Sequence, residues 1–306
     1  MRHVLLERLA CPLCRAQGHP SAYEVDPTRV GGGEDGGAPG ELLEGYLVCL
    51  RCRAARPVVG GTPILPLDLD AHLAAHGNVY RRLALGDPRV VRLLLGRAGE
   101  GMDVVPFAEV VARYADLLPP AVAPPSGLIG PKAPAPVDLA LDAAVREARA
   151  RGPALEIGCG VGRGTFLLAA RTGDAVGVDR SVARIRRAIH VAHADEVLLP
   201  AVDGAPAEAS IDLGALARDR VDFAVADPEA LPFRDGAFAT VVLHRGDGDG
   251  PFADFAAARA EAVRVGAPGG DLFVEAPAVG LPGARGADPS FERVPVGGPR
   301  AEVPAP

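Results

Sequence analysis

Short apolar runs alternate with amphipathic stretches through the second half of the chain. Five of these runs have the length of buried strands, namely LEIG from Leu155, VGVD ending at Asp179, VDFAVA from Val221, FATVVLH over Phe238–His244 and GGDLFVEAP starting at Gly269. Helical spacing separates the last two over Asp254–Val265, and another helix is predicted to begin at Asp138 and lead into the first strand. Strands that alternate with helices in this way predict a doubly wound α/β fold with a mostly parallel sheet.

The first half of the chain has weaker periodicity. Helical apolar spacing recurs around Ala71–His76, Pro88–Arg97 and Pro106–Leu118, which predicts several short helices. Two segments have compositions that cannot form a packed core. The glycine-rich run Gly31–Gly40 predicts the flexible tip of an enlarged hairpin, and Pro119–Pro136 predicts a semi-rigid linker.

These patterns divide the chain into four parts. We expect a small module over residues 1–66, a helical segment with the Pro-rich linker over 67–136, an α/β domain over 137–277 and an irregular tail over 278–306. With 306 residues, 48% of them hydrophobic, the chain is long enough for one sizeable hydrophobic core and a small module that needs a bound metal ion for stability.

The turn after the first predicted strand, LEIGCGVGRG, is the most specific motif. Glycines at alternate positions of Gly158–Gly162 allow a tight turn and a close backbone approach to a ligand. The dinucleotide pattern G-x-G-x-x-G is not met, because Arg163 or Thr165 stands at its last position. Glu156, just before the turn, would repel phosphates and favour an ammonium group, such as that of S-adenosylmethionine. Taken alone, the glycines are equally compatible with an ordinary strand-to-helix turn.

Together with Asp179 and Asp227 at the ends of later strands, this turn resembles the class I S-adenosylmethionine-dependent methyltransferases, with a domain of the methyltransferase type 11 kind over Val137–Pro277. The resemblance implies a Rossmann-like fold in which Glu156 and the glycine turn hold the methionine part of the cofactor. By the same likeness Asp179 accepts the ribose hydroxyls and Asp227 accepts the adenine amine. The implied cofactor-binding set is Glu156, Gly158, Cys159, Gly160, Gly162, Asp179, Arg180, Asp227, Pro228 and His244.

The sequence departs from that family pattern at two places. Val197–Arg220 is longer than expected and predicts an inserted hairpin around Asp203–Pro206. After Glu275 only Pro- and Gly-rich sequence remains, so the sheet looks truncated after its fifth strand. An uncovered fifth strand would invite pairing, and we expect the tail, the helical segment or a second copy of the chain to lie against it.

Four cysteines near the N-terminus form two C-x2-C pairs, Cys11 with Cys14 and Cys49 with Cys52. Four thiolates in this arrangement are typical of a structural zinc ribbon, and disulfides are the alternative. Cys159 stands outside the set, where a small filler is a simpler interpretation than a reactive thiol.

The flanking sequence, LLERLACPLC and EGYLVCLRCRAARPVVGGTPILP within Val4–Pro66, resembles the small zinc-ribbon activator proteins that partner tRNA, ribosomal RNA and translation-factor methyltransferases. The resemblance implies a ribbon fused to a catalytic domain, where it serves structure or substrate docking.

The formal net charge of −7 gives the whole protein no general attraction for nucleic acid. The arginine groups at 180–187 and 51–56 are either solvated faces or local RNA contacts. No stretch approaches the ~20 apolar residues of a membrane helix, and Val4–Ala10 is too short and too charged for a secretory signal. We therefore expect a cytoplasmic protein.

His244, just beyond the fourth strand, is the candidate general base, because histidine titrates near neutral pH; a surface histidine is the alternative. The segment Ala226–Glu229 is not the N-P-P-Y type of motif, which disfavours adenine-N6 and glutamine methylation. The short helices could form a linker domain or a lid that carries Tyr80, Arg81, Arg82 or Tyr114.

Three functional hypotheses remain open at this point. The first is a methyltransferase that acts on a small metabolite, which the acidic charge favours. The second is an RNA or translation-factor methyltransferase that docks through its ribbon. The third is a cofactor-binding scaffold without catalysis that serves a protein partner. Under each hypothesis, the exposed edge of the sheet could also form a homo-oligomer.

Overall fold

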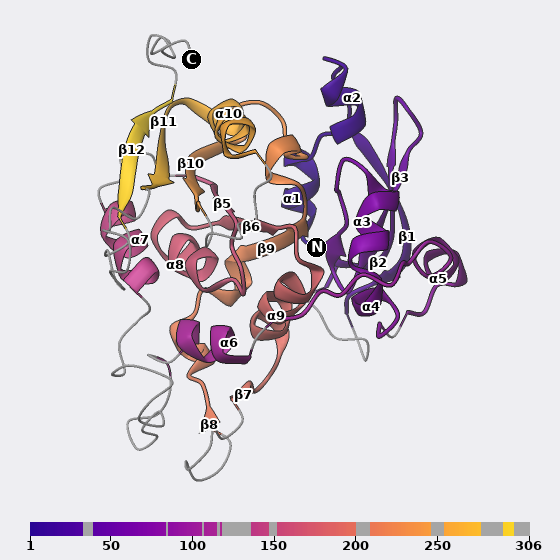
Figure 1. Ribbon diagram of the computed structural model, residues 1–306, viewed down its shortest axis with the longest axis horizontal. Coiled ribbons are helices and arrows are strands. Elements are labelled where there is room, and N and C mark those ends of the chain that lie inside the picture. Colours follow the sequence, from indigo (N-terminus) through magenta and orange to yellow (C-terminus); the bar gives the residue numbers. More distant parts are fainter. Residues whose placement is uncertain are drawn as a thin grey trace.

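The computed structural model describes residues 1–32, 39–83, 85–105, 107–114, 117, 136–146, 152–199, 209–245, 254–276 and 290–296. Its centre is a six-stranded sheet with the order β12-β11-β10-β5-β6-β9 (Figure 1). The strands are β5 (Ala154–Ile157), β6 (Ala175–Asp179), β9 (Val221–Val225), β10 (Phe238–Leu243), β11 (Gly266–Glu275) and β12 (Phe291–Pro295). All neighbours are parallel except β11 and β12. The predicted mostly parallel α/β sheet is confirmed.

Side chains of the sheet alternate between two faces, and each face is covered. On one face Phe223 and Val242 share a core with three helices, α7 (Pro136–Arg146), α8 (Arg163–Thr172) and α9 (Val182–His193). On the other face Leu155 and Val176 share a core with α10 (Phe255–Val265) and with residues of the N-terminal module. Period-two alternation of apolar side chains, covered on both sides, is what a doubly wound sheet requires.

The N-terminal module contains the antiparallel sheet β1 (Tyr23–Val30), β2 (Leu42–Cys49), β3 (Ala55–Val59) and β4 (Thr62–Pro63), after the short helices α1 (His3–Arg8) and α2 (Pro12–Ala16). The pairing of β1 with β2 confirms the predicted hairpin, while 33–38 of its glycine-rich tip lie outside the described residues.

This module is packed onto the central sheet rather than tethered beside it (Figure 1). Leu5 and Leu9 of its first segment are fully buried in the core of the second sheet face. After β4, Ile64 forms a parallel bridge with Val225 of β9, and the Leu65 N–H donates to the Val225 carbonyl over 2.8 Å. The module therefore covers both a face and an edge of the sheet.

The helical segment folds as α3 (Leu69–Ala75), α4 (Gly77–Tyr80), α5 (Pro88–Leu95) and α6 (Phe107–Tyr114). Asp68 and Asp87 cap α3 and α5 by accepting N–H groups of the first turn. The expected short helices are confirmed, with ends shifted by a few residues. The expected linker before α7 lies outside the described residues, and α7 begins at Pro136, two residues before the predicted start.

The expected irregular tail contains a strand, which corrects the prediction of a sheet that ends at its fifth strand. β12 pairs antiparallel with β11 from Phe291 opposite Glu275 to Pro295 opposite Asp271. The described part of the tail thus pairs with the last five residues of β11, in agreement with the expectation that the tail lies against this edge. β11 itself begins at Gly266, three residues before its predicted start.

The inserted hairpin is present in part. β7 (Leu198–Leu199) pairs antiparallel with β8 (Ala209–Ser210), and its predicted tip at 203–206 lies outside the described residues. Within the described ranges, no helix is both long and apolar enough to cross a membrane.

Candidate functional site

The glycine turn joins β5 to α8 and is shaped by left-handed backbone at Gly160 (φ 55°) and Gly162 (φ 90°). A Cβ on Gly162 would lie 2.7 Å from the Ala188 Cβ, so a glycine is needed there to let α9 pack against the turn. A Cβ on Gly160 would meet only the Glu109 carboxylate at 3.6 Å. The two glycines therefore serve different purposes: close packing at Gly162 and backbone conformation at Gly160.

Asp179 ends β6 and lies against this turn with 3% of its surface exposed. Its carboxylate accepts the N–H of Gly160 over 3.0 Å and the N–H of Ser181 over 2.8 Å. Burial raises the pKa of Asp179 above its ordinary value, and the two backbone donors oppose that shift. Each carboxylate oxygen keeps a further acceptor position, so the group can still accept a vicinal diol.

Glu156 is fully buried just before the turn, and both of its oxygens have partners. One accepts the Thr165 hydroxyl over 2.5 Å, and the other lies 2.8 Å from Nε2 of His244. The second ring nitrogen of His244 lies 3.3 Å from the Glu275 carboxylate. The structure thus brings together two predicted residues, Glu156 and His244, and adds Thr165 and Glu275, which the sequence reasoning missed.

His244 is 6% exposed, so the alternative of a surface histidine is wrong. Burial lowers its pKa, but the hydrogen bonds to Glu156 and Glu275 outweigh burial and raise the pKa to about 9. At neutral pH the ring is an imidazolium held between two carboxylates. It can act as a base only after it has lost that proton.

Asp227, beyond the end of β9, is linked to the N-terminal module. One of its carboxylate oxygens accepts the Leu67 N–H over 2.8 Å, and the other lies 3.2 Å from Nε of Arg180. Arg180 also pairs with Glu229 at 2.6 Å, and Pro228 begins a short buried 3-10 turn between the two acids. The predicted residues Arg180, Asp227 and Pro228 therefore lie together, beside the segment that leaves the ribbon.

Cys159 is fully buried inside the turn. Burial raises the pKa of its thiol well above the ordinary value, and the charges of Asp179 and Glu156 act in the same direction. A neutral buried thiol is unreactive, which agrees with the prediction of a small filler.

Helix α6 lies over the glycine turn. The Tyr114 hydroxyl donates to the Val161 carbonyl over 2.7 Å, and Glu109 pairs with Arg184 of α9 at 2.9 Å. Ahead of α6, Asp103 supports the start of α9 by accepting the Ser181 hydroxyl over 2.6 Å and the Ala183 N–H over 3.0 Å. Glu109 and Asp103 were missed because they act across long sequence separations; only the amphipathic run FAEVVARY hinted at a packed helix.

Of the four residues proposed for a lid, only Tyr114 contacts the glycine turn. Tyr80 is buried, and its hydroxyl lies 2.9 Å from Nε2 of His72. Arg81 pairs with Glu100 at the surface, and Arg82 is exposed. The helical segment thus covers the turn through α6 rather than through α4.

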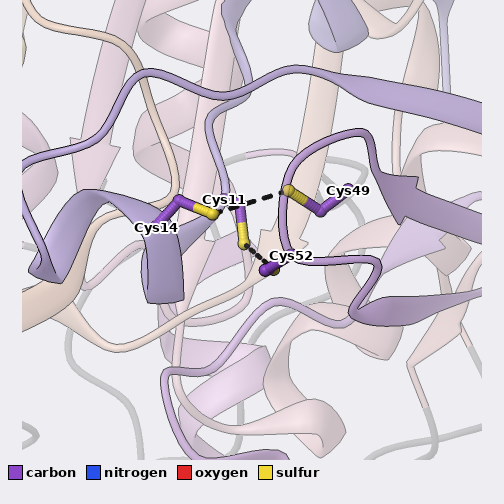
Figure 2. A group of neighbouring side chains, drawn as sticks. All are labelled: Cys11, Cys14, Cys49 and Cys52. Atoms are coloured by element: carbon purple, nitrogen blue, oxygen red, sulfur yellow. Dashed lines mark hydrogen bonds between the residues drawn. The ribbon is translucent and has the colours of Figure 1, made fainter.

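The four cysteines of the ribbon converge on one point between α2 and the β2–β3 turn (Figure 2). The sulfurs of Cys11 and Cys52 are 3.7 Å apart, as are those of Cys14 and Cys49, and all four lie within 4.8 Å of one another. Zinc–sulfur bonds of about 2.3 Å in a tetrahedron require sulfur–sulfur separations of about 3.8 Å. The geometry fits a four-thiolate metal site.

Comparison with known proteins finds one similar family model, over part of the chain. Residues 155–274 match a family model described as a methyltransferase domain. No curated protein sequence matches the chain.

Three solved structures illustrate the similarity. The YcgJ protein of Bacillus subtilis is 20% identical with a TM-score of 0.34, over 45% of this chain and 50% of that one. The complex of the Haloferax volcanii Trm112 methyltransferase activator with a putative methyltransferase is 18% identical with a TM-score of 0.32, over 44% and 50%. Phosphoethanolamine N-methyltransferase 2 of Haemonchus contortus is 22% identical with a TM-score of 0.34, over 45% and 27%.

The matched region of this chain spans about half the length of these structures or less. The family model begins at the strand before the glycine turn and ends at the last parallel strand of the sheet. Over residues 155–274 the chain is therefore similar to a methyltransferase domain.

Proposed function

We propose that the protein transfers a methyl group from S-adenosylmethionine to a small-molecule acceptor. The observation that carries this proposal is the buried Asp179 carboxylate, fixed by two backbone N–H groups beside the left-handed glycine turn. A carboxylate held in this way can bind a ribose diol without first reorganising. When bound, S-adenosylmethionine supplies a methyl group that is activated by the positive sulfur.

The remaining cofactor contacts are assigned by position. We assign Asp227 and Arg180 to contacts with the adenine. The backbone of the glycine turn is assigned to contacts with the methionine part of the cofactor. Glu156 is assigned to the cofactor's ammonium group, which would share the carboxylate with His244. The base role of His244 requires its proton to leave first, so we give this residue a positioning role for Glu156 at neutral pH.

A small acceptor is supported by α6, which lies over the glycine turn and limits access from that side. The ribbon offers little positive charge to RNA. Arg56 is 3% exposed and Arg53 pairs with Glu24 at 2.9 Å, which leaves Arg51 of the three arginines beside the second knuckle. The RNA or translation-factor alternative therefore ranks second.

We also propose that Cys11, Cys14, Cys49 and Cys52 bind one structural zinc ion. The sulfur separations support this assignment, and a set of four thiolates leaves no coordination position for chemistry. Metal analysis of the purified protein is expected to give one zinc per chain.

The central test is calorimetric titration with S-adenosylmethionine and S-adenosylhomocysteine. Asp179→Ala is expected to weaken binding by about 2 kcal/mol or more, because two ribose hydroxyls would lose a charged acceptor. The matched control is Asp219→Ala, since that side chain is 81% exposed and far from the turn. Equal affinities for wild type and Asp179→Ala would contradict the assignment.

The acceptor class is tested separately with methyl-labelled cofactor. Label is expected in a low-molecular-weight metabolite fraction and not in tRNA, ribosomal RNA or a ribosome-associated protein fraction. Transfer to one of the macromolecular fractions would replace the small-molecule assignment with the docking alternative.

A further inference from the structure

A cavity of about 300 Å³ lies where the ribbon sheet, the helical segment and α9 meet. Half of its lining residues are aliphatic, among them Val59 and Ile64 from the ribbon, Leu83 and Leu85 from the helical segment, and Ile185 and Ile189 from α9. This volume is at the lower end of the range for small-molecule sites, and such an aliphatic lining favours a hydrocarbon body over water.

The polar groups of this cavity carry positive charge. Arg29 and Arg186 both line it, and within the described part of the chain neither forms an ion pair. Nε of Arg29 is buried and has no hydrogen-bond partner among the described residues. A buried donor without an acceptor is costly, and a ligand anion would satisfy it.

Glu44 is the one carboxylate among these lining residues, and its oxygens accept backbone N–H groups rather than pairing with Arg29 or Arg186. Both oxygens of Glu44 accept the Gly86 N–H, and one of them also accepts the Asp87 N–H. On the α9 side of the cavity, burial and the positive charges of Arg187 and Arg186 lower the pKa of His190. The protein as a whole is acidic, with a net charge of −7, whereas this partly aliphatic cavity is lined by two guanidinium groups without an ion-pair partner among the described residues.

The cavity is separate from the methyltransferase site. On α9, Arg184 and Ala188 point to Glu109 and the glycine turn, whereas Ile185, Arg186 and Ile189 line the cavity. Residues of a helix that are one position apart differ by about 100° in direction. The helix therefore separates the two sites.

We propose that this cavity binds a small amphipathic anion, with its hydrocarbon body among the aliphatic side chains and its anionic group on Arg29 and Arg186. A carboxylate suits these guanidinium groups because it accepts paired hydrogen bonds from their planar N–H donors. The site does not depend on the proposed methyl transfer.

Calorimetric titration with decanoate tests the proposal, and decyltrimethylammonium serves as the probe of opposite charge. Decanoate is expected to bind one per chain, and decyltrimethylammonium at least tenfold more weakly. Arg186→Gln is expected to weaken decanoate binding by about tenfold, because one charged hydrogen-bonding partner is lost. Ile189→Trp, which fills the cavity, is expected to abolish binding.

Arg187→Gln is the matched control. Arg187 is the next residue on the same helix and is also exposed, but it lines only an adjoining cavity of about 450 Å³. Its loss is expected to change decanoate affinity by less than twofold. Thermal unfolding of each variant, with its midpoint within a few degrees of wild type, shows that the fold is intact.

Three results would overturn the proposal: no saturable decanoate binding, equal binding of both probes, or equal losses in Arg186→Gln and Arg187→Gln. A polyuridine RNA that binds and loses affinity equally in both arginine variants would assign the arginines to an open polyanion surface instead. S-adenosylhomocysteine binding in the same samples separates failure of this site from failure of the proposed function.

Discussion

His244 is held between Glu156 and Glu275 in the interior of the methyltransferase domain. An imidazolium placed between two carboxylates neutralises charge that would otherwise be costly to bury. The pair formed with Glu156 also fixes the carboxylate that we assign to the cofactor's ammonium group. One residue thereby contributes to both stability and ligand geometry.

This arrangement predicts a pH dependence of stability. The pKa of about 9 in the folded protein lies above the ordinary value of 6.5, so the stabilisation is fully present below about pH 6.5 and is lost as pH rises through 9. Urea unfolding at pH 6 to 9.5 is expected to show a fall of up to about 3 kcal/mol. His244→Gln is expected to flatten that fall, and parallel curves for the two proteins would contradict a raised pKa.

At the scale of elements, α6 is held to the glycine turn by a hydrogen bond and to α9 by an ion pair, and both join distant parts of the chain. The Tyr114 hydroxyl reaches Val161 across 47 residues, and Glu109 reaches Arg184 across 75. Neither side chain would be well placed if α6 moved away. The contacts between α6 and the turn therefore set the shape of this side of the proposed cofactor site.

Tyr114→Phe tests how firmly α6 is held. Removing the hydroxyl leaves the buried Val161 carbonyl without this donor, and we expect a loss of about 1 to 2 kcal/mol in the free energy of unfolding. Tyr46→Phe is the control, because Tyr46 is also buried but lies in the ribbon sheet. Urea unfolding measures both variants, and equal losses would argue against a specific role for the Tyr114 hydroxyl.

The parallel strands and their acidic ends could be predicted from sequence because each strand is a short apolar run ended by a turn signal. β12 could not, since Glu292 and Arg293 interrupt its apolar pattern within a Pro- and Gly-rich tail. It is fixed by pairing with β11 and by an ion pair between Arg293 and Asp271. Glu109 and Asp103 escaped prediction for the same reason: their partners are distant in the sequence.

At the scale of the whole molecule, the ribbon and the methyltransferase domain share one interior. Arg2 pairs with Asp222 at 2.8 Å and with Asp174 at 2.7 Å, and Arg15 of the ribbon pairs with Glu261 of α10 at 2.7 Å. Together with the contact between Ile64 and β9, these pairs join the module to the sheet at several separate points. Loss of the proposed zinc ion is therefore expected to affect the entire chain.

Metal removal is expected to lower the thermal midpoint of the whole protein in a single transition, by more than about 5 °C, because metal binding stabilises the ribbon and the ribbon supports the sheet. Cys49→Ser is expected to act in the same way. Cys159→Ala is the matched control, since this fifth cysteine lies outside the cluster and should leave zinc content unchanged. Scanning calorimetry with two well-separated transitions would instead show independent units.

The bridge from Ile64 to Val225 has a practical consequence for anyone who wishes to dissect this protein. A fragment that starts at residue 137 would expose the outer edge of β9, which keeps only β6 as a partner, and an apolar sheet surface that α1 normally shields. Unpaired strands and exposed apolar surface promote aggregation. Such a fragment should precipitate on expression, whereas supplying residues 1–66 in trans should rescue its solubility.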